Sequence, residues 1–402
     1  MPRSTDERHL TGNYAPVTEE TTIADLAVDG AIPHALSGQY LRIGPNPIGT
    51  PPQPYDWPDS DPMVHSITLR AGRAVAYRNR WVNTDAAASR RGNEPAPGPR
   101  RSGTDATGTT VLAFAGSILS FGDGALAYQL SAELDTVRRV DLAGGARGVG
   151  GHPAIDPHTA DLHLLSFADD GTPSHVVVSS NGMTRRSRTI ADPPGRIEAL
   201  AVARDHVVLF GDGFAGVMAR SGDTRVEWAT AGAGAVHPVS AHDDGDTVVV
   251  HTTGAALERW TFDASSESVR RTVLDPAPQA FGRVDERLLG TNHRFLWTIG
   301  AGPELPFDGT DLHEHDLVSG TRQSHEFGPG RHPGELVFVA DPARAGTAKG
   351  GWLVGFVHDD ARHEADLVVL DAAVITRPPL AIVHIPRRIP YGLHGAWIPT
   401  NH

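Results

Sequence analysis

The sequence predicts an all-β protein that folds as one closed β-propeller. Glycine and proline account for 44 and 31 of the 402 residues, and they interrupt the chain too often for long helices. Many short apolar or alternating runs lie between these interruptions, as is typical of strands. No linker divides the chain, and a propeller with ~40–45 residues per blade matches a single unit of this length. We therefore expect residues 1–402 to form one domain.

Strand candidates occur along almost the whole chain. In order they are Tyr40–Ile43, Thr110–Phe121, Leu162–Phe167, His175–Val178, Val207–Phe210, Thr247–Val250, Leu353–Val357 and Leu367–Leu370. The pairs Asp170-Gly171 and Asp244-Gly245 lie beside such runs and favour hairpin turns. Only Ile23–Ala27 and Glu133–Thr136 suit a helix, and each allows one or two turns at most.

One stretch without a strand pattern runs from Thr84 to Gly108. It contains three consecutive alanines, an Arg-Arg pair and the proline-rich run Pro95–Pro99. This composition predicts either a mobile lid or a disordered insert, and it favours disorder.

Charge and composition exclude several functional classes. The chain has 48 acidic and 35 basic residues, and it has no basic stripe, so we expect no nucleic-acid partner and no anionic membrane surface. It has no cysteine, which excludes disulfides, thiolate metal sites and cysteine nucleophiles. The charged start leads into no apolar segment, and no run approaches the ~18 apolar residues of a membrane span. We expect a cytoplasmic protein with no stable membrane insertion.

The C-terminal tail around His394 is the most constrained stretch. The sequence contains 21 histidines, so residue type alone selects none of them. His394, however, lies between Gly392 and Gly395, where we expect close backbone approaches that a Cβ would block. Trp397 supplies bulk to hold the segment in a core. His394 is therefore a candidate functional residue.

Taken together, the motifs of the chain resemble those of the carotenoid cleavage oxygenase family, which includes apocarotenoid and lignostilbene oxygenases. The matching segments are Asn13–Val17, Gly38–Pro47, Met63–Ser66, Tyr77–Val82, His152–Pro157, Gly334–Val339 and the His394 tail. The resemblance covers nearly the whole chain. It implies a seven-bladed β-propeller with a central metal site and a dome of loops over the axis. It also implies Fe(II) held by neutral histidines, and O2-dependent scission of an alkene in an apolar conjugated substrate.

The resemblance carries three metal ligands over to this chain, His152, His237 and His394. The second of the family's four histidines falls on Glu198, while the nearby His206 matches a position that is not a ligand. Glu198 is a metal ligand, a salt-bridged structural acid or an inert replacement. Three imidazoles and one carboxylate suit Fe(II), Mn(II) or Zn(II), of which the family favours Fe(II).

The carboxylates that orient the ligands in this family are also altered. Glu335 matches the one that supports His394, and Asp123 matches another, although its Gly-Asp-Gly setting also suits an ordinary turn. The third position is Ala280, so His237 is expected to lack a carboxylate partner. Lignostilbene-cleaving relatives have a lysine before the position of Asp123, where this chain has Gly122, which argues against phenolic stilbenes.

Two hypotheses about function follow. The first is a non-heme metal-dependent oxygenase that uses O2 on an alkene of an apocarotenoid- or stilbene-like molecule. The alternative is a metal-poor or non-redox small-molecule-binding propeller that has lost oxygenase chemistry. Two other histidine pairs, His313 with His315 and His358 with His363, are expected to be solvated.

Overall fold

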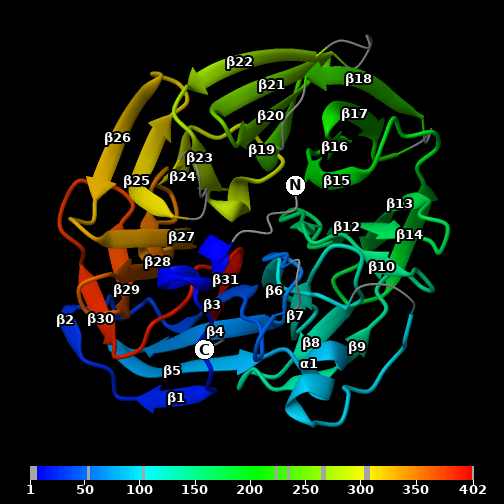
Figure 1. The fold of residues 1–402 in the computed structure, drawn as a ribbon. Coiled ribbons are helices and arrows are strands. Elements are labelled where there is room, and N and C mark those ends of the chain that lie inside the picture. Colours follow the sequence, from blue (N-terminus) through cyan, green and yellow to red (C-terminus); the bar gives the residue numbers. More distant parts are fainter. Residues whose placement is uncertain are drawn as a thin grey trace.

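The computed structural model describes residues 7–51, 55–101, 105–221, 225–232, 236–263, 269–302 and 308–400. These residues form seven antiparallel sheets around a common axis (Figure 1), which confirms the predicted seven-bladed propeller. We number the sheets as blades 1 to 7 from the N-terminus.

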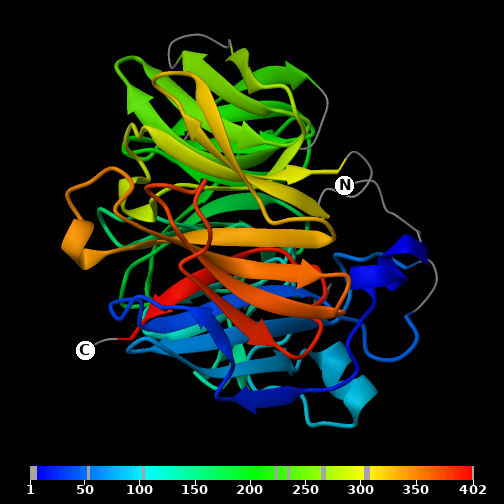
Figure 2. The same ribbon diagram turned by 90° about the vertical axis from the view of Figure 1, so that its left-hand side faces the viewer.

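The first and last blades each contain a strand from the opposite end of the chain. Blade 1 has the order β1 (Thr21–Ala24), β5 (Arg73–Trp81), β4 (Pro62–Arg70), β3 (Gly38–Pro45) and β31 (Gly395–Pro399). Blade 7 has the order β2 (Val28–Gly30), β30 (Ala381–Ile385), β29 (Glu364–Asp371), β28 (Gly351–Asp359) and β27 (Arg331–Ala340). Both exchanges close the ring, and the red strand β31 lies among the blue strands of blade 1 (Figures 1 and 2).

The other five blades are built from consecutive strands. Blade 2 comprises β6 (Thr110–Phe114), β7 (Ser117–Phe121), β8 (Ala127–Leu130) and β9 (Thr136–Val140). Blade 3 comprises β10 (Gly148–Val149), β11 (Ala154–Ile155), β12 (Leu162–Phe167), β13 (Pro173–Val178) and β14 (Thr184–Thr189). Blade 4 comprises β15 (Ile197–Val202), β16 (His206–Gly211), β17 (Gly213–Ala219) and β18 (Val226–Gly232). Blade 5 comprises β19 (His237–Asp244), β20 (Thr247–Thr253), β21 (Leu257–Asp263) and β22 (Val269–Asp275). Blade 6 comprises β23 (Gln279–Arg283), β24 (Phe295–Ala301), β25 (Gly309–Asp316) and β26 (Thr321–Glu326).

All the strand candidates of the sequence lie in strands of the structure. The two Asp-Gly turns are also confirmed, and Gly171 and Gly245 have φ angles of +85° and +60°. The helical pattern at Ile23–Ala27 was misleading, because Thr21–Ala24 pairs with β5 as the edge strand of blade 1. Sheet pairing there overrides a weak local preference.

The core is a ring of apolar clusters, with one cluster between each pair of neighbouring blades. The smallest lies between blades 5 and 6, where the buried apolar residues are Leu257, Val284 and Leu296. Beside it, the Ser240 hydroxyl lies 3.3 Å from His251 Nδ1 and 3.2 Å from His293 Nε2. Hydrogen-bonded imidazoles thus fill part of this junction. None of the helices in the described ranges is long and apolar enough to span a bilayer.

The stretch from Thr84 to Gly108 has more defined structure than its composition predicted. It contains helix α1 (Asp85–Arg91), whose N-terminus is capped by the Thr84 hydroxyl and which ends at Gly92 with a φ of +68°. The Asp85 carboxylate accepts two hydrogen bonds of 2.8 and 2.9 Å from Arg139 in β9, and Arg90 forms an ion pair with Asp61. These contacts attach the segment around α1 to blades 1 and 2.

The expectation of solvated histidine pairs is wrong for three of the four residues. His313 and His315 on β25 are 6% exposed, and His358 is 4% exposed. The two β25 imidazoles do share a strand face, as alternation predicts, but that face is turned toward Asp275 of blade 5 and is buried. Burial here follows from the packing of blades, which the local pattern does not contain.

A charged cluster joins blades 6 and 7 near the tail. His332 Nδ1 lies 3.0 Å from Asp308, and its Nε2 lies 3.0 Å from Asp360. The Tyr391 hydroxyl donates a hydrogen bond of 2.7 Å to Asp308, and His358 lies 3.2 Å from Asp360. The hydrogen bond to Asp308, reinforced by Asp360, raises the pKa of His332 to about 9, although burial opposes the shift.

We expect His332→Gln to destabilise the protein at pH 6 and to have little effect at pH 10. Because the pKa in the folded protein lies above the ordinary value of 6.5, protonation favours the folded state. This contribution is complete below pH ~6.5 and is lost as the pH rises through about 9. Because Asp308 and Asp360 are partly exposed, solvent screens their ion pairs with His332. We therefore expect the free energy of unfolding to fall by about 1–2 kcal/mol at pH 6. Thermal unfolding at both pH values measures this loss of stability, and His34→Gln at an exposed position is the control. An equal loss at pH 6 and pH 10 would contradict the raised pKa of His332.

Candidate metal centre

A cavity of about 420 Å³ lies on the propeller axis. Every blade contributes its innermost strand to the cavity wall, namely β6, β11, β15, β19, β23, β27 and β31. Much of the wall is apolar, with Leu112, Ile155, Leu200, Val202 and Val239 among the lining residues. An apolar wall with a few converging polar groups is the usual character of a small-molecule site.

Three of the predicted ligands, His152, His237 and His394, line this cavity together. His152 precedes β11, His237 is the first residue of β19, and His394 precedes β31, so the three come from blades 3, 5 and 1. The ring centroid of His152 lies 5.3 Å from that of His394 and 6.0 Å from that of His237.

These separations suit a shared metal ion once the rings adjust slightly. Imidazoles that bind one ion at ~2.1 Å have ring centroids roughly 4.5–5.3 Å apart. The His152–His394 pair meets this range, and His237 is somewhat too distant. Accordingly, no three histidine or acidic side chains in the described ranges are arranged to hold a metal ion without such movement. The residue types are those that bind divalent metal ions, and the three rings face one cavity.

The surroundings of His152 and His237 favour the neutral form of both imidazoles. Burial, with the neighbouring His394, lowers the pKa of His152 to about 4, while Asp123 and Glu335 act in the opposite direction. Burial, with His152 and His394, lowers the pKa of His237 to about 3. Neutral imidazoles retain the nitrogen lone pair that a metal ion needs.

Glu335 on β27 orients His394. Its carboxylate is 1% exposed and lies 2.9 Å from His394 Nδ1, while its second oxygen accepts a hydrogen bond of 2.7 Å from the Gly395 N–H. Burial alone would raise the pKa of Glu335, but Arg283 and His394 lower it to about 2. The ionised carboxylate accepts the Nδ1 proton of His394, which leaves Nε2 free to bind a metal.

The tail reaches this position through close backbone contacts. His394 donates its N–H to Thr109 and accepts from Ile43, which holds the residue between blades 2 and 1. A Cβ on Gly395 would lie 2.1 Å from the Leu41 carbonyl oxygen, and one on Gly392 would lie 2.8 Å from Ile43 O. Both glycines therefore permit a close approach, as the sequence predicted, and neither needs a positive φ.

The other two histidines are oriented differently. Asp123, which is exposed, accepts a hydrogen bond of 2.7 Å from the N–H of Gly151, so it fixes the turn before His152. Ala280 on β23 is buried and offers no side-chain acceptor. In the described part of the chain, no hydrogen bond is made by the ring of His152 or His237.

Glu198 does not line the cavity. It lies half-buried on β15 at a bulge, where the register with β16 shifts between Ile197 and Ala199. Among the described residues it makes no hydrogen bond or ion pair. Bulges can redirect a side chain next to a site, and Glu335 also lies at one, between Pro333 and Leu336. His206 does not line the cavity, and its Nδ1 lies 2.6 Å from Asp243.

Arg283 is a residue of the site that the sequence did not identify. It lines the cavity from β23, and its guanidinium binds both oxygens of Glu335, at 2.9 and 2.8 Å. Burial alone would lower the pKa of Arg283, whereas Glu335 and Glu286 raise it. Its partner is 52 residues away along the chain, so no local signal could have revealed the contact.

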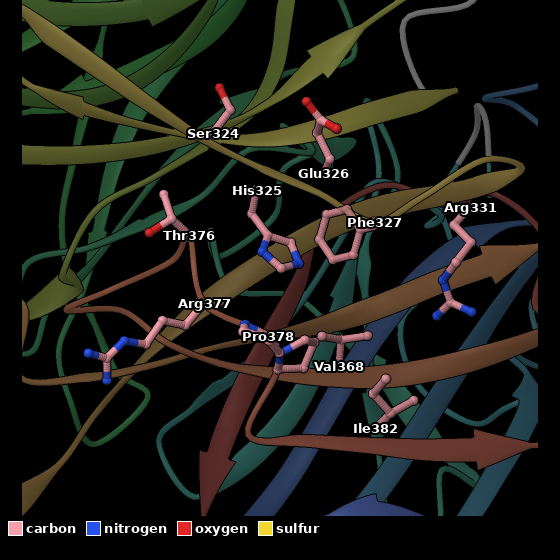
Figure 3. A pocket seen from close by; sticks show the side chains of 11 residues that line it. Ser324, His325, Glu326, Phe327, Arg331, Val368, Thr376, Arg377, Pro378 and Ile382 are labelled. Carbon is pink, nitrogen blue, oxygen red and sulfur yellow. The ribbon is translucent and has the colours of Figure 1, made fainter.

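A second cleft, of about 460 Å³, lies at the outer side of the ring between blades 6 and 7. Figure 3 shows the rings of His325 and Phe327 side by side above Pro378, with their centroids 4.7 Å apart. Arg331 forms ion pairs with Asp359 and Asp366, and His325 Nδ1 donates a hydrogen bond to the carbonyl of Ile375. These polar groups already have partners, so the axial cavity is the better candidate site.

Comparison with known proteins gives a consistent result over nearly the whole chain. Residues 14–231 and 214–399 match the model of the retinal pigment epithelial membrane protein family. The chain is 31% identical to a carotenoid cleavage oxygenase of Mycobacterium tuberculosis, with 98% of both chains covered.

Solved structures share the same fold. A lignostilbene dioxygenase of Pseudomonas brassicacearum has a TM-score of 0.87 at 22% identity and covers 98% of both chains. A cobalt-substituted apocarotenoid oxygenase of Synechocystis has a TM-score of 0.84 at 22% identity, covering 96% of this chain and 97% of its own.

Proposed function

Because the chain belongs to the family of the retinal pigment epithelial membrane protein and the carotenoid cleavage oxygenases, we propose that it is a metal-dependent oxygenase. Its substrate would be an alkene in an apolar conjugated small molecule, of the apocarotenoid or stilbene kind. The observation that carries this proposal is the convergence of three imidazoles, from three blades, on one apolar cavity.

His152, His237 and His394 would hold the ion, which we propose to be Fe(II), with Mn(II) or Zn(II) as the other candidates. Bound Fe(II) supplies redox chemistry toward O2 that no side chain of the cavity has. The chain contributes the environment. Glu335 holds the His394 ring in one orientation and one tautomer, and the apolar wall excludes water and receives the substrate.

Glu198 is the candidate for a fourth ligand position. Its place in the bulge of β15 supports this assignment, because the same strand already lines the cavity through Leu200 and Ala201. Its carboxylate would have to turn toward the axis. A carboxylate there would reduce the positive charge of the centre by one relative to a fourth imidazole.

The size and lining of the cavity support a small apolar substrate. A volume of about 420 Å³ lies within the range of ~300–1,000 Å³ that holds drug-sized ligands. The only charged groups on the wall beyond the ligand region lie toward Asp156 and the turn η3 (Glu286–Leu288). An elongated molecule with an apolar body would fill the interior and place a polar end at this rim.

One observation favours the alternative, a binding propeller that has lost oxygenase chemistry. Of the three imidazoles only His394 has a carboxylate partner, and Glu198 is outside the cavity lining. Carboxylates that orient metal-binding histidines are worth ~10–100-fold in affinity each. A protein without two of them would hold its ion less tightly.

Metal content decides between the two. We expect protein purified without oxygen to take up close to one equivalent of Fe(II), measured by elemental mass spectrometry, and Glu198→His to bind it at least tenfold more tightly. The added imidazole is a neutral ligand at a position where the native side chain does not line the cavity, although its strand does. The iron-loaded protein is then screened under O2 for aldehydes formed from apocarotenoids and stilbenes.

Each outcome has a consequence. Stoichiometric iron with aldehyde formation supports the oxygenase. Stoichiometric zinc or manganese that iron does not displace would mean different chemistry on the same ligands. No metal in the native protein, together with uptake by Glu198→His, would favour the binding propeller.

A further inference from the structure

The carboxylate of Glu335 is held symmetrically by four hydrogen bonds. One oxygen lies 2.9 Å from Arg283 Nε and 2.9 Å from His394 Nδ1. The other accepts 2.8 Å from Arg283 Nη2 and 2.7 Å from the Gly395 N–H. Each oxygen therefore has one donor from Arg283 and one from the tail.

Arg283 also contacts the tail directly. Its Nη2 donates 2.6 Å to the carbonyl of Gly395, and its Nη1 lies 2.6 Å from Glu286. The guanidinium thus connects β23 of blade 6, β27 of blade 7 and β31 of blade 1, next to His394. A planar guanidinium can make all these contacts at once, and a lysine ammonium cannot.

We propose that Arg283 is a positioning residue for the metal centre, which fixes the carboxylate of Glu335 and, through it, the ring of His394. This inference rests on the proposed function, since it requires that His394 binds a metal.

The physical reason lies in the geometry of the carboxylate. Glu335 is 1% exposed, so without Arg283 it keeps only the two hydrogen-bond donors of the tail and loses the cation that contacts both of its oxygens. It can then rotate, and the His394 ring turns with it. Loss of orientation in such a carboxylate typically weakens metal binding ~10–100-fold.

The test measures the dissociation constant of Co²⁺ by competition with a chelator, together with the visible spectrum of the bound ion. We expect Arg283→Met to raise this constant 10–100-fold and to change the spectrum, and Arg283→Lys to recover part of the affinity. Each variant is first checked for cooperative unfolding without metal. If Arg283→Met does not fold, Arg283→Lys carries the test, with an expected weakening of about 10-fold.

A double-mutant cycle separates an action through Glu335 from a general loss of packing. Arg283→Met combined with Glu335→Gln should bind Co²⁺ no more than threefold worse than the weaker single variant, because both remove the same restraint. If the double variant weakened Co²⁺ binding by the product of the two single-variant effects, the proposal would be overturned.

The chain provides a matched control in Arg271. It contacts Glu258 at 3.0 and 2.7 Å and donates 2.5 Å to the carbonyl of Ala231 in the neighbouring blade, away from the cavity. Arg271→Met should alter stability and leave the Co²⁺ constant within threefold. A native protein that binds no Co²⁺ would refute the proposed function, whereas native binding that Arg283→Met leaves unchanged would refute the role of Arg283 alone.

Discussion

Replacing His237 with alanine should abolish stoichiometric metal binding while the fold persists. Apparent binding energies of ~10–16 kcal/mol for four-ligand sites correspond to about 3 kcal/mol per ligand, so loss of one should weaken binding more than 100-fold. His237 is the proposed ligand chosen for removal, because in the described structure its ring makes no hydrogen bond that the substitution would break. Metal content and the Co²⁺ dissociation constant, measured beside thermal unfolding of the metal-free protein, report the two effects separately.

The control for this variant is His206→Ala. His206 lies on β16, is paired with Asp243, and matches a family position that is not a ligand. It should leave metal binding unchanged. If His206→Ala lost the metal and His237→Ala kept it, the assignment of the ligands to the axial cavity would be wrong.

Ending the chain after Leu393 should prevent the formation of a stable protein. The deletion removes His394 and β31, whose register with β3 runs from Gly38↔Pro399 to Arg42↔Gly395. It also removes Trp397, which packs on the cluster between blades 1 and 7. A lost aromatic side chain alone costs ~3–5 kcal/mol, a large part of the ~5–15 kcal/mol that stabilises a typical protein.

The exposed edge of β3 would add an aggregation hazard, so we expect the truncated protein in the insoluble fraction. Solubility and circular dichroism measure the outcome. A chain that ends after Thr400 keeps the whole of β31 and should behave as the full-length protein. A soluble truncated chain with an unchanged unfolding midpoint would show that β31 does not close the ring.

Much of the fold was accessible from sequence because its determinants are local. Short β-branched runs such as Thr247–Val250 and turns such as Asp244-Gly245 each specify one strand or hairpin. The number of blades came from the family resemblance, since the blades differ too much for a visible repeat. The defined structure of the stretch around α1 was missed because Asp85 is held by Arg139, a contact across 54 residues.

The site was predictable to a smaller extent. The motifs placed His152, His237, His394 and Glu335, and the structure brings these four residues to one cavity. Glu198 is different, because its direction depends on a bulge in β15 that no residue pattern announces. Arg283 was missed for a related reason, since an arginine on a strand is unremarkable until its partner on another blade is known.

The position of β31 in blade 1 has a consequence for biosynthesis. Domains generally fold from the N-terminus during synthesis, yet β3, β4 and β5 must wait for a strand made after every other strand of the ring. The same late segment brings His394. Blades 2 to 6 can assemble as they leave the ribosome, but the axial cavity cannot acquire its third imidazole until the ring is shut. An ion that binds all three proposed ligands would therefore be loaded after synthesis, and any nascent chain stalled before residue 394 has neither a closed propeller nor a complete set of these histidines.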